Sequence, residues 1–189
     1  MRRIAIFISG EGSNALKMLD EYSSSYAVDV ALVYSSKHNL KVQNACKEKG
    51  VEFHFLSWNL KTQEDILGLC IKKDISWVVL AGFLKLIPES FIDYFPNKIV
   101  NIHPALLPKF GGKGMYGMHV HKAVIAAKSN ESGISIHFVN GAYDEGQIIA
   151  QFKIGLEPKE TPETLSLKIR ALEHQYFSET VVQLVQGNL

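Results

Sequence analysis

The chain contains little cysteine, and its cysteines show no paired spacing. Cys46 and Cys70 are the only two among 189 residues. A disulfide framework and a zinc site built on cysteine pairs are therefore both disfavoured, and reduced thiols of a cytoplasmic protein are the simpler interpretation.

Long apolar runs and a strong net charge are also missing. No segment approaches the run of about 18 to 20 apolar residues that a membrane-spanning helix needs, and the first ten residues carry no cleavage site. The 20 basic residues nearly balance the 19 acidic ones. The chain therefore has no excess of positive charge that would attract a nucleic-acid backbone or an anionic membrane. We expect a cytoplasmic monomer or weak homodimer with small-molecule partners, no nucleic acid and no membrane.

The sequence does contain a regular alternation of apolar runs and helical periodicity. Strands are predicted at 3–8, 29–34, 51–56, 77–82, 99–103, 133–139 and 148–154. Helices are predicted at 14–22, 41–50, 64–73, 88–95, 121–128 and 162–185. No linker interrupts this pattern, which predicts one domain over residues 1–189. The fold class is α/β, a Rossmann-like open, mostly parallel twisted sheet with helices on both faces.

The strand at 99–103 ends in two polar residues just before Pro104. Side chains alternate along a strand at ~3.3 Å per residue, so Asn101 and His103 face the same way, about 6.6 Å apart. A small polar atom fits between them. Ligands of open α/β sheets bind beyond the carboxyl ends of strands, where the strand order reverses, and we expect the end of this strand to be one such place.

A glycine-containing loop, "ISGEGSN", follows the first strand. Its two glycines permit tight turns, Ser13 and Asn14 are suited to cap the next helix, and free N–H groups there would hold an anion. Ala15 stands where a dinucleotide fingerprint needs glycine, so a single phosphate fits better than a pyrophosphate. A plain glycine turn is the alternative, and Glu11 is compatible with a phosphate only if its side chain points outward.

A second polar cluster is predicted in the loop "VNGAYDEGQ". Asp144 alone reads as a turn aspartate, but beside His103 its carboxylate would orient the imidazole and favour the protonated ring. Asn101, His103 and Asp144 would then polarise a carbonyl. His137 is interpreted as support near this site. His119 and His121 have no third partner at metal-ligand spacing, so no metal site is expected.

These motifs together resemble a known enzyme family. "ISGEGSN", "AGFLKLIP", "NIHPALLPKF", "GISIHFVNGAYDEG" and "LEHQYF" occur in the order found in the phosphoribosylglycinamide formyltransferases, the folate-dependent formyltransferases of purine biosynthesis. The resemblance covers nearly the whole chain. It implies that the amine of glycinamide ribonucleotide attacks the formyl group of 10-formyltetrahydrofolate, the co-substrate, through a tetrahedral intermediate. No metal and no covalent nucleophile are implied.

The resemblance also implies roles for individual residues. The catalytic group is Asn101, His103 and Asp144, with the first two donating to the oxyanion and Asp144 holding the imidazole and relaying protons through water. The family's phosphate and ribose contacts fall on Gly12, Ser13, Asn14 and Glu173. The folate contacts fall on Leu84, Lys85, Leu86, Ile87, Val139, Asn140 and Asp144. Lys85 stands where arginine is common. The N-terminal half would bind the phosphate, and the C-terminal half would bind folate and carry the catalysis.

Two other functions remain open from the residues. A formyltetrahydrofolate hydrolase, or a formyltransferase acting on another amine, would use the same Asn, His and Asp. A non-catalytic nucleotide-binding module would use the glycine loop but leave that polar group unexplained. The stretch "GGKGMYGMHVHKAV" is longer than the corresponding loop in many members of the family, and its first part, segment 111–117, has four glycines in seven residues. We predict that this segment closes as a lid over the substrates.

Overall fold

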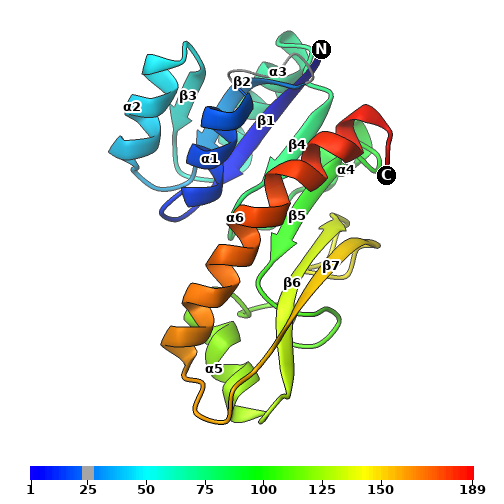
Figure 1. Cartoon of the computed structure of the whole chain (residues 1–189). Helices are drawn as coiled ribbons and strands as arrows, with labels where there is room; N and C mark the ends of the chain where they lie inside the picture. The colour runs from blue at the N-terminus through cyan, green and yellow to red at the C-terminus, as the bar shows by residue number, and fades with distance from the viewer. Residues whose placement is uncertain (23–27) are drawn as a thin grey trace.

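The computed structural model describes residues 1–22 and 28–189, which build a seven-stranded sheet with helices on both faces (Figure 1). The strands are β1 (Arg2–Ile8), β2 (Val28–Ser35), β3 (Glu52–Phe55), β4 (Trp77–Leu80), β5 (Ile99–His103), β6 (Glu131–Phe138) and β7 (Ile148–Gly155). The helices are α1 (Ser13–Tyr22), α2 (Leu40–Glu48), α3 (Leu60–Lys72), α4 (Glu89–Tyr94), α5 (Met118–Ala126) and α6 (Pro162–Gln186). Every predicted strand and helix has a counterpart in this set.

The sheet is parallel from β3 to β5 and antiparallel beyond β5. Its strand order is β3-β2-β1-β4-β5-β6-β7, and both β5–β6 and β6–β7 pair antiparallel. The predicted open and mostly parallel sheet is confirmed. The strand order reverses between β1 and β4, so the prediction of a reversal at the end of β5 was wrong by one strand, because sequence periodicity does not encode strand order.

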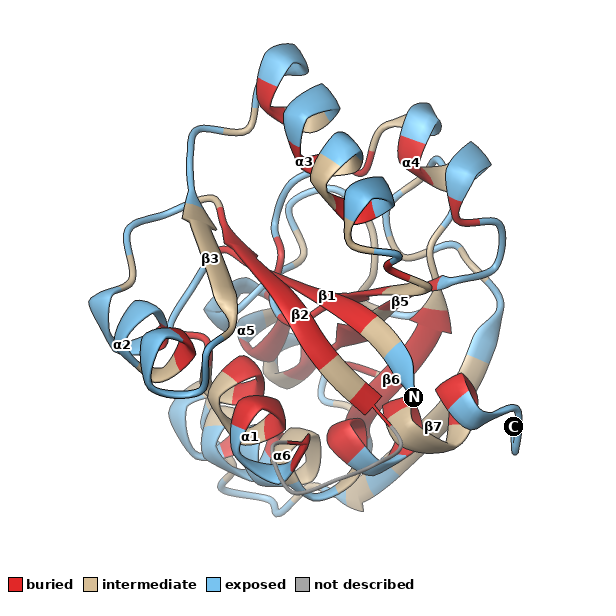
Figure 2. Ribbon diagram, turned by 90° about the horizontal axis from the view of Figure 1, so that it is seen from above, coloured by how far each residue is buried: buried red, intermediate tan, exposed pale blue. Residues whose placement is uncertain are grey.

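Two apolar layers cover the sheet, and alternation along β1 shows how they form. Ile4, Ile6 and Ile8 face the layer made with α1, α2, α5 and α6. Ala5 and Phe7 face the layer made with α3 and α4. Figure 2 shows the buried strands between these two groups of helices. Successive side chains of β1 thus point to opposite faces of the sheet, and both sets are apolar because both faces are buried.

Two helices begin three or four residues earlier than predicted, and side-chain caps fix the starts of two helices. Asn59 accepts a hydrogen bond from the Thr62 N–H at 3.0 Å, so α3 begins four residues earlier than predicted. Thr161 forms a capping box with Thr164 at the start of α6. Helix α5 begins at Met118, three residues before the predicted start. No helix in the described part of the chain is both long and apolar enough to cross a membrane.

Candidate active site

A cavity of about 570 Å³ opens beyond the carboxyl ends of β1, β4 and β5. One end of it, here called the glycine-loop end, is formed by Gly12, Ser13, Asn14, Arg170 and Glu173. The opposite side, here called the leucine wall, is formed by Leu84, Lys85, Leu86, Ile87, Val139 and Asn140. Asn101, His103 and Asp144, the Asn–His–Asp group, also line the cavity. Each end of the cavity thus takes residues from both halves of the chain.

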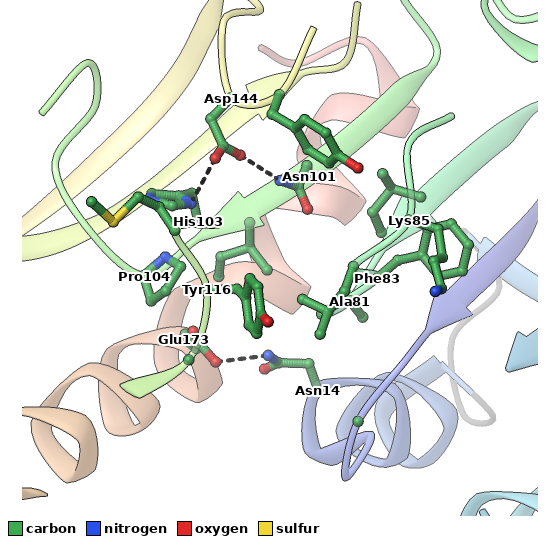
Figure 3. A pocket seen from close by; sticks show the side chains of 18 of the residues that line it. Asn14, Ala81, Phe83, Lys85, Asn101, His103, Pro104, Tyr116, Asp144 and Glu173 are labelled. Atoms are coloured by element: carbon green, nitrogen blue, oxygen red, sulfur yellow. Dashed lines mark hydrogen bonds and ion pairs between the residues drawn. The ribbon is translucent and has the colours of Figure 1, made fainter. Parts of the chain in front are cut away.

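The Asn–His–Asp group is held together by the two oxygens of one carboxylate. Strand β5 presents Asn101 and His103 on the same side, as predicted. His103 Nδ1 lies 3.4 Å from Asp144 Oδ2, and Asn101 Nδ2 lies 3.5 Å from Asp144 Oδ1. Figure 3 shows Asp144 between the other two side chains. The three residues singled out from the sequence therefore meet in space.

The loop after β6 is shaped to deliver Asp144 to this point. Asp144 has a left-handed backbone, with φ of 58°, which aspartate tolerates better than most residues. A Cβ on Gly146 would lie 1.7 Å from the Phe138 carbonyl oxygen, so only glycine lets the loop return onto the end of β6. The Gly112 N–H donates to Asp144 Oδ2 at 3.0 Å, the same oxygen that faces His103, and helps to fix the carboxylate.

The electrostatic surroundings keep Asp144 charged. Burial raises the pKa of its carboxyl, but the hydrogen bond from His103 and the charge of His103 outweigh burial. The Gly112 N–H acts in the same direction. The pKa of Asp144 therefore lies well below its usual range, which favours the negatively charged carboxylate beside the imidazole.

His137 contacts the Asn–His–Asp group directly. Its Nδ1 lies 2.7 Å from the Phe138 carbonyl oxygen, which fixes the proton on that nitrogen. Its Nε2 then accepts from Asn101 Nδ2 at 3.1 Å. The sequence placed His137 near the site, and the structure adds the contact that orients the Asn101 amide.

His103 is engaged at both ring nitrogens. Besides its contact with Asp144, its Nε2 lies 2.8 Å from the Phe110 carbonyl oxygen. Phe110 immediately precedes segment 111–117 and has a left-handed φ of 58°. A substrate oxygen that takes a hydrogen bond from His103 Nε2 must therefore replace this carbonyl.

The glycine-loop end is organised by a hydrogen bond between residues far apart in the sequence. Helix α1 begins at Ser13, so Ser13 and Asn14 lie in its first turn, and the predicted capping role was wrong. Asn14 Nδ2 instead donates to Glu173 Oε2 at 2.9 Å, a contact drawn in Figure 3. The N–H groups of a first turn have no intrahelical partner and suit an anion. A Cβ on Gly12 would lie 2.6 Å from Val42, so the loop needs glycine there.

Charged residues flank this end. Burial raises the pKa of Glu173 above its usual value, although Asn14 and the charges of Arg170 and His103 oppose the rise. Arg170 Nη2 lies 3.0 Å from Glu11 Oε2, and the Glu11 side chain is 74% exposed. Glu11 thus points outward, as the sequence analysis requires if this loop is to bind a phosphate. Sequence reasoning missed Arg170, although its spacing of three from Glu173 on one helix was a usable signal.

The leucine wall exposes apolar side chains to the cavity. Leu84 and Leu86 are 37% and 45% exposed, unlike the ordinary core residues that their position after β4 suggests, whereas Ile87 is buried. The Trp58 indole N–H donates to the Leu86 carbonyl at 3.0 Å and so anchors the backbone of the leucine wall. Sequence reasoning missed Trp58, because its partner lies 28 residues away.

The two histidines of α5 do not form a pair. His119 is exposed and lies edge-to-face with Tyr116, with 5.4 Å between the two ring centroids. His121, in contrast, is buried and lines the cavity. Within residues 1–22 and 28–189, no three or more His, Cys, Asp and Glu side chains are grouped so that they could hold a metal ion.

Comparisons with known proteins point to one family. The family model described as "Formyl transferase" matches residues 2–181. A relative from Haemophilus influenzae, named phosphoribosylglycinamide formyltransferase, is 30% identical over all of this chain and 90% of its own length. A chloroplastic relative of the same name from Arabidopsis thaliana is 37% identical over 95% of this chain. The chain spans 64% of that relative's length and 62% of one from Vigna unguiculata.

Solved structures give the same result. The phosphoribosylglycinamide formyltransferase of Bacillus halodurans has a TM-score of 0.86 and 33% identity, with 97% of this chain and 95% of that chain covered. Glycinamide ribonucleotide transformylase 1 of Geobacillus kaustophilus has a TM-score of 0.88 and 30% identity, with 98% and 99% covered. The family model spans most of the chain, and the likeness to these structures extends over nearly all of it. The chain therefore belongs to the formyl transferase family.

Proposed function

We propose that the protein transfers the formyl group of 10-formyltetrahydrofolate to the amine of glycinamide ribonucleotide, giving formylglycinamide ribonucleotide and tetrahydrofolate for purine biosynthesis. One observation carries this proposal: a single cavity joins an anion-suited helix start, an apolar wall and, between them, the Asn–His–Asp group. The reaction needs these three features in one cavity, because a phosphorylated amine must meet a bulky formyl donor.

The ribonucleotide occupies the glycine-loop end. Its phosphate accepts hydrogen bonds from the first-turn N–H groups at Gly12, Ser13 and Asn14, with the positive helix end and Arg170 adding attraction. Glu173 accepts from the ribose hydroxyls. Its hydrogen bond to Asn14 holds the carboxylate in place before the substrate arrives.

The folate occupies the leucine wall. Leu84, Leu86 and Ile87 offer apolar contact to the pteridine, and the backbone from Val139 to Asp144 offers polar groups to its edge. Lys85 lies on the same wall and is suited to the negative glutamate tail as a point charge, without the planar fork of arginine.

The chemical step takes place at the Asn–His–Asp group. The amine nitrogen bonds to the formyl carbon, and the carbonyl electron pair moves onto oxygen. Asn101 and His103 donate to that oxyanion, Asn101 with the N–H that otherwise makes the long 3.5 Å contact with Asp144. One such donor is typically worth ~2.7–4 kcal/mol. The oxyanion takes the place of the Phe110 carbonyl at His103. When the intermediate collapses, the folate nitrogen leaves with its bonding electrons and takes a proton that Asp144 relays through water from the amine.

The remaining aspects of the proposal concern the setting of the reaction. Residues 1–189 act as one domain, as a monomer or weak homodimer in the cytoplasm. Its partners are the two small-molecule substrates, and the reaction as proposed uses neither a metal nor a covalent intermediate with the protein.

Incubation with 10-formyltetrahydrofolate, with and without glycinamide ribonucleotide, tests the proposal. We expect tetrahydrofolate to form only when the ribonucleotide is present. Equal deformylation without an acceptor would indicate the hydrolase, and transfer to a different amine would indicate another formyltransferase. Neither turnover nor folate binding would indicate the nucleotide-binding module.

A further inference from the structure

His121 is a cavity-lining residue that the proposed reaction has not yet used. Helix α5 buries its side chain, which is 4% exposed, and leaves His119, on the same helix, in solvent. Helix α5 packs against α6, the helix that carries Glu173. His121 therefore lines the cavity from a helix that packs on the Glu173 helix, and it lies near enough to His103 for the charge of His103 to act on it.

One ring nitrogen of His121 is buried without a hydrogen-bond partner in the described part of the chain. Its Nδ1 is sealed from solvent with no partner within the described residues. A buried polar atom without a partner is destabilising, and an apolar side chain would avoid this penalty. Packing alone therefore does not favour histidine at this position.

Burial and a nearby charge both favour the neutral form of this ring. Burial lowers the pKa of His121, and the nearby charge of His103 lowers it further. A neutral imidazole offers one donor and one acceptor. Since Nδ1 is sealed, Nε2 is the nitrogen left to meet a molecule in the cavity.

We propose that His121 contacts the acceptor substrate, with its Nε2 hydrogen-bonding a polar group of the ribonucleotide between His103 and Glu173. The inference rests on the proposed function, because it assigns the glycine-loop end to the ribonucleotide. It adds a second specificity contact to Glu173, supplied by α5 and independent of the phosphate.

Three variants test the inference: His121→Phe, which keeps the ring size without nitrogen; His121→Gln, whose amide reaches the Nε2 position; and His119→Phe as the matched control on the same helix. Thermal stability and the KM for each substrate are measured for all of them. For His121→Phe we expect unchanged or higher thermal stability, because the unpartnered nitrogen is gone. We expect its KM for the ribonucleotide to rise about tenfold, the equivalent of one lost hydrogen bond of ~1.4 kcal/mol, with KM for folate unchanged.

His121→Gln should recover most of the ribonucleotide KM, and His119→Phe should leave both KM values unchanged. A folded His121→Phe variant with the normal ribonucleotide KM, or with equal rises for both substrates, overturns the inference. If His121→Phe does not fold, His121→Gln is compared with His121→Asn, whose amide lies at the Nδ1 position. A lower KM for the ribonucleotide in His121→Gln than in His121→Asn supports the inference. An equal or lower KM in His121→Asn overturns it. Loss of ribonucleotide-dependent transfer in the unmodified protein would instead refute the proposed function.

Discussion

At the scale of single residues, Asp144 connects three parts of the site. Its Oδ2 meets His103 and the Gly112 N–H, and its Oδ1 faces Asn101. The carboxylate thus links strand β5 to the glycine-rich segment that follows it. A residue with partners on several elements acts with them as a unit, and its removal affects all of them.

Substitution of the His–Asp pair should show this dependence. His103→Ala and Asp144→Asn should each reduce kcat by about 10²- to 10⁴-fold, the usual contribution of positioned acid–base groups. The double variant should be hardly slower than either single one, because residues that act as a unit are non-additive. Circular dichroism of each variant controls for folding. Fully additive losses would show that the two side chains act separately.

Glu173 should link stability to substrate binding. Its pKa is raised in the folded protein, so it stabilises the fold below its unfolded pKa of about 4.3, and this contribution is lost as pH rises through the folded value. Glu173→Gln, which still accepts from Asn14, should therefore be more stable than the unmodified protein at pH 7, and this advantage should disappear below about pH 4.

The same substitution should weaken binding of the ribonucleotide more than of folate. Denaturant titration at both pH values and separate KM measurements check the two effects. Equal weakening of both substrates would show that Glu173 does not contact the ribonucleotide.

At the scale of elements, the segment 111–117 differs from its surroundings. It lines the cavity, and three of its four glycines have a left-handed backbone: Gly112, Gly114 and Gly117. The Gly112 N–H binds Asp144, so the start of the segment is part of the site. Met115 packs against the core, whereas Tyr116 is 45% exposed. Closure as a lid remains a prediction.

Shortening this segment tests the lid. Replacing residues 113–116 by Ser-Ser retains Gly112 and its N–H to Asp144. We expect less formyl transfer and a larger hydrolysed fraction, because water is the competing acceptor in an open site. Transfer and formate release are measured in parallel. If neither rate changes, the segment is an inert surface loop.

Trp58 should position the leucine wall. The centroid of its ring lies 5.1 Å from that of Phe83, and its N–H donates a hydrogen bond to the Leu86 carbonyl. Trp58→Phe retains the aromatic packing but removes the hydrogen bond, so KM for the folate should rise about three- to tenfold, as a loss of roughly 0.5–1.5 kcal/mol predicts. Trp77→Phe, at the start of β4, is the matched control. A rise in KM for the ribonucleotide alone would contradict this role.

At the scale of the whole molecule, periodicity predicted the elements, and the motifs predicted the family. The alternation of Ile4, Ala5, Ile6 and Phe7 between two layers follows from a buried strand, and so does the shared face of Asn101 and His103. Strand order was not predictable, and some long-range contacts were not either. The bond from Asn14 to Glu173 spans 159 residues and leaves no local pattern in either segment.

The fate of the formyl carbon tests the proposed function of the molecule as a whole. With an isotopic label in the formyl group of 10-formyltetrahydrofolate, nuclear magnetic resonance distinguishes the product amide from free formate. We expect the label to enter formylglycinamide ribonucleotide in amounts equal to the tetrahydrofolate formed, and to stay on folate when no ribonucleotide is added. Release of the label as formate, at the same rate with and without the ribonucleotide, would contradict the proposed transfer.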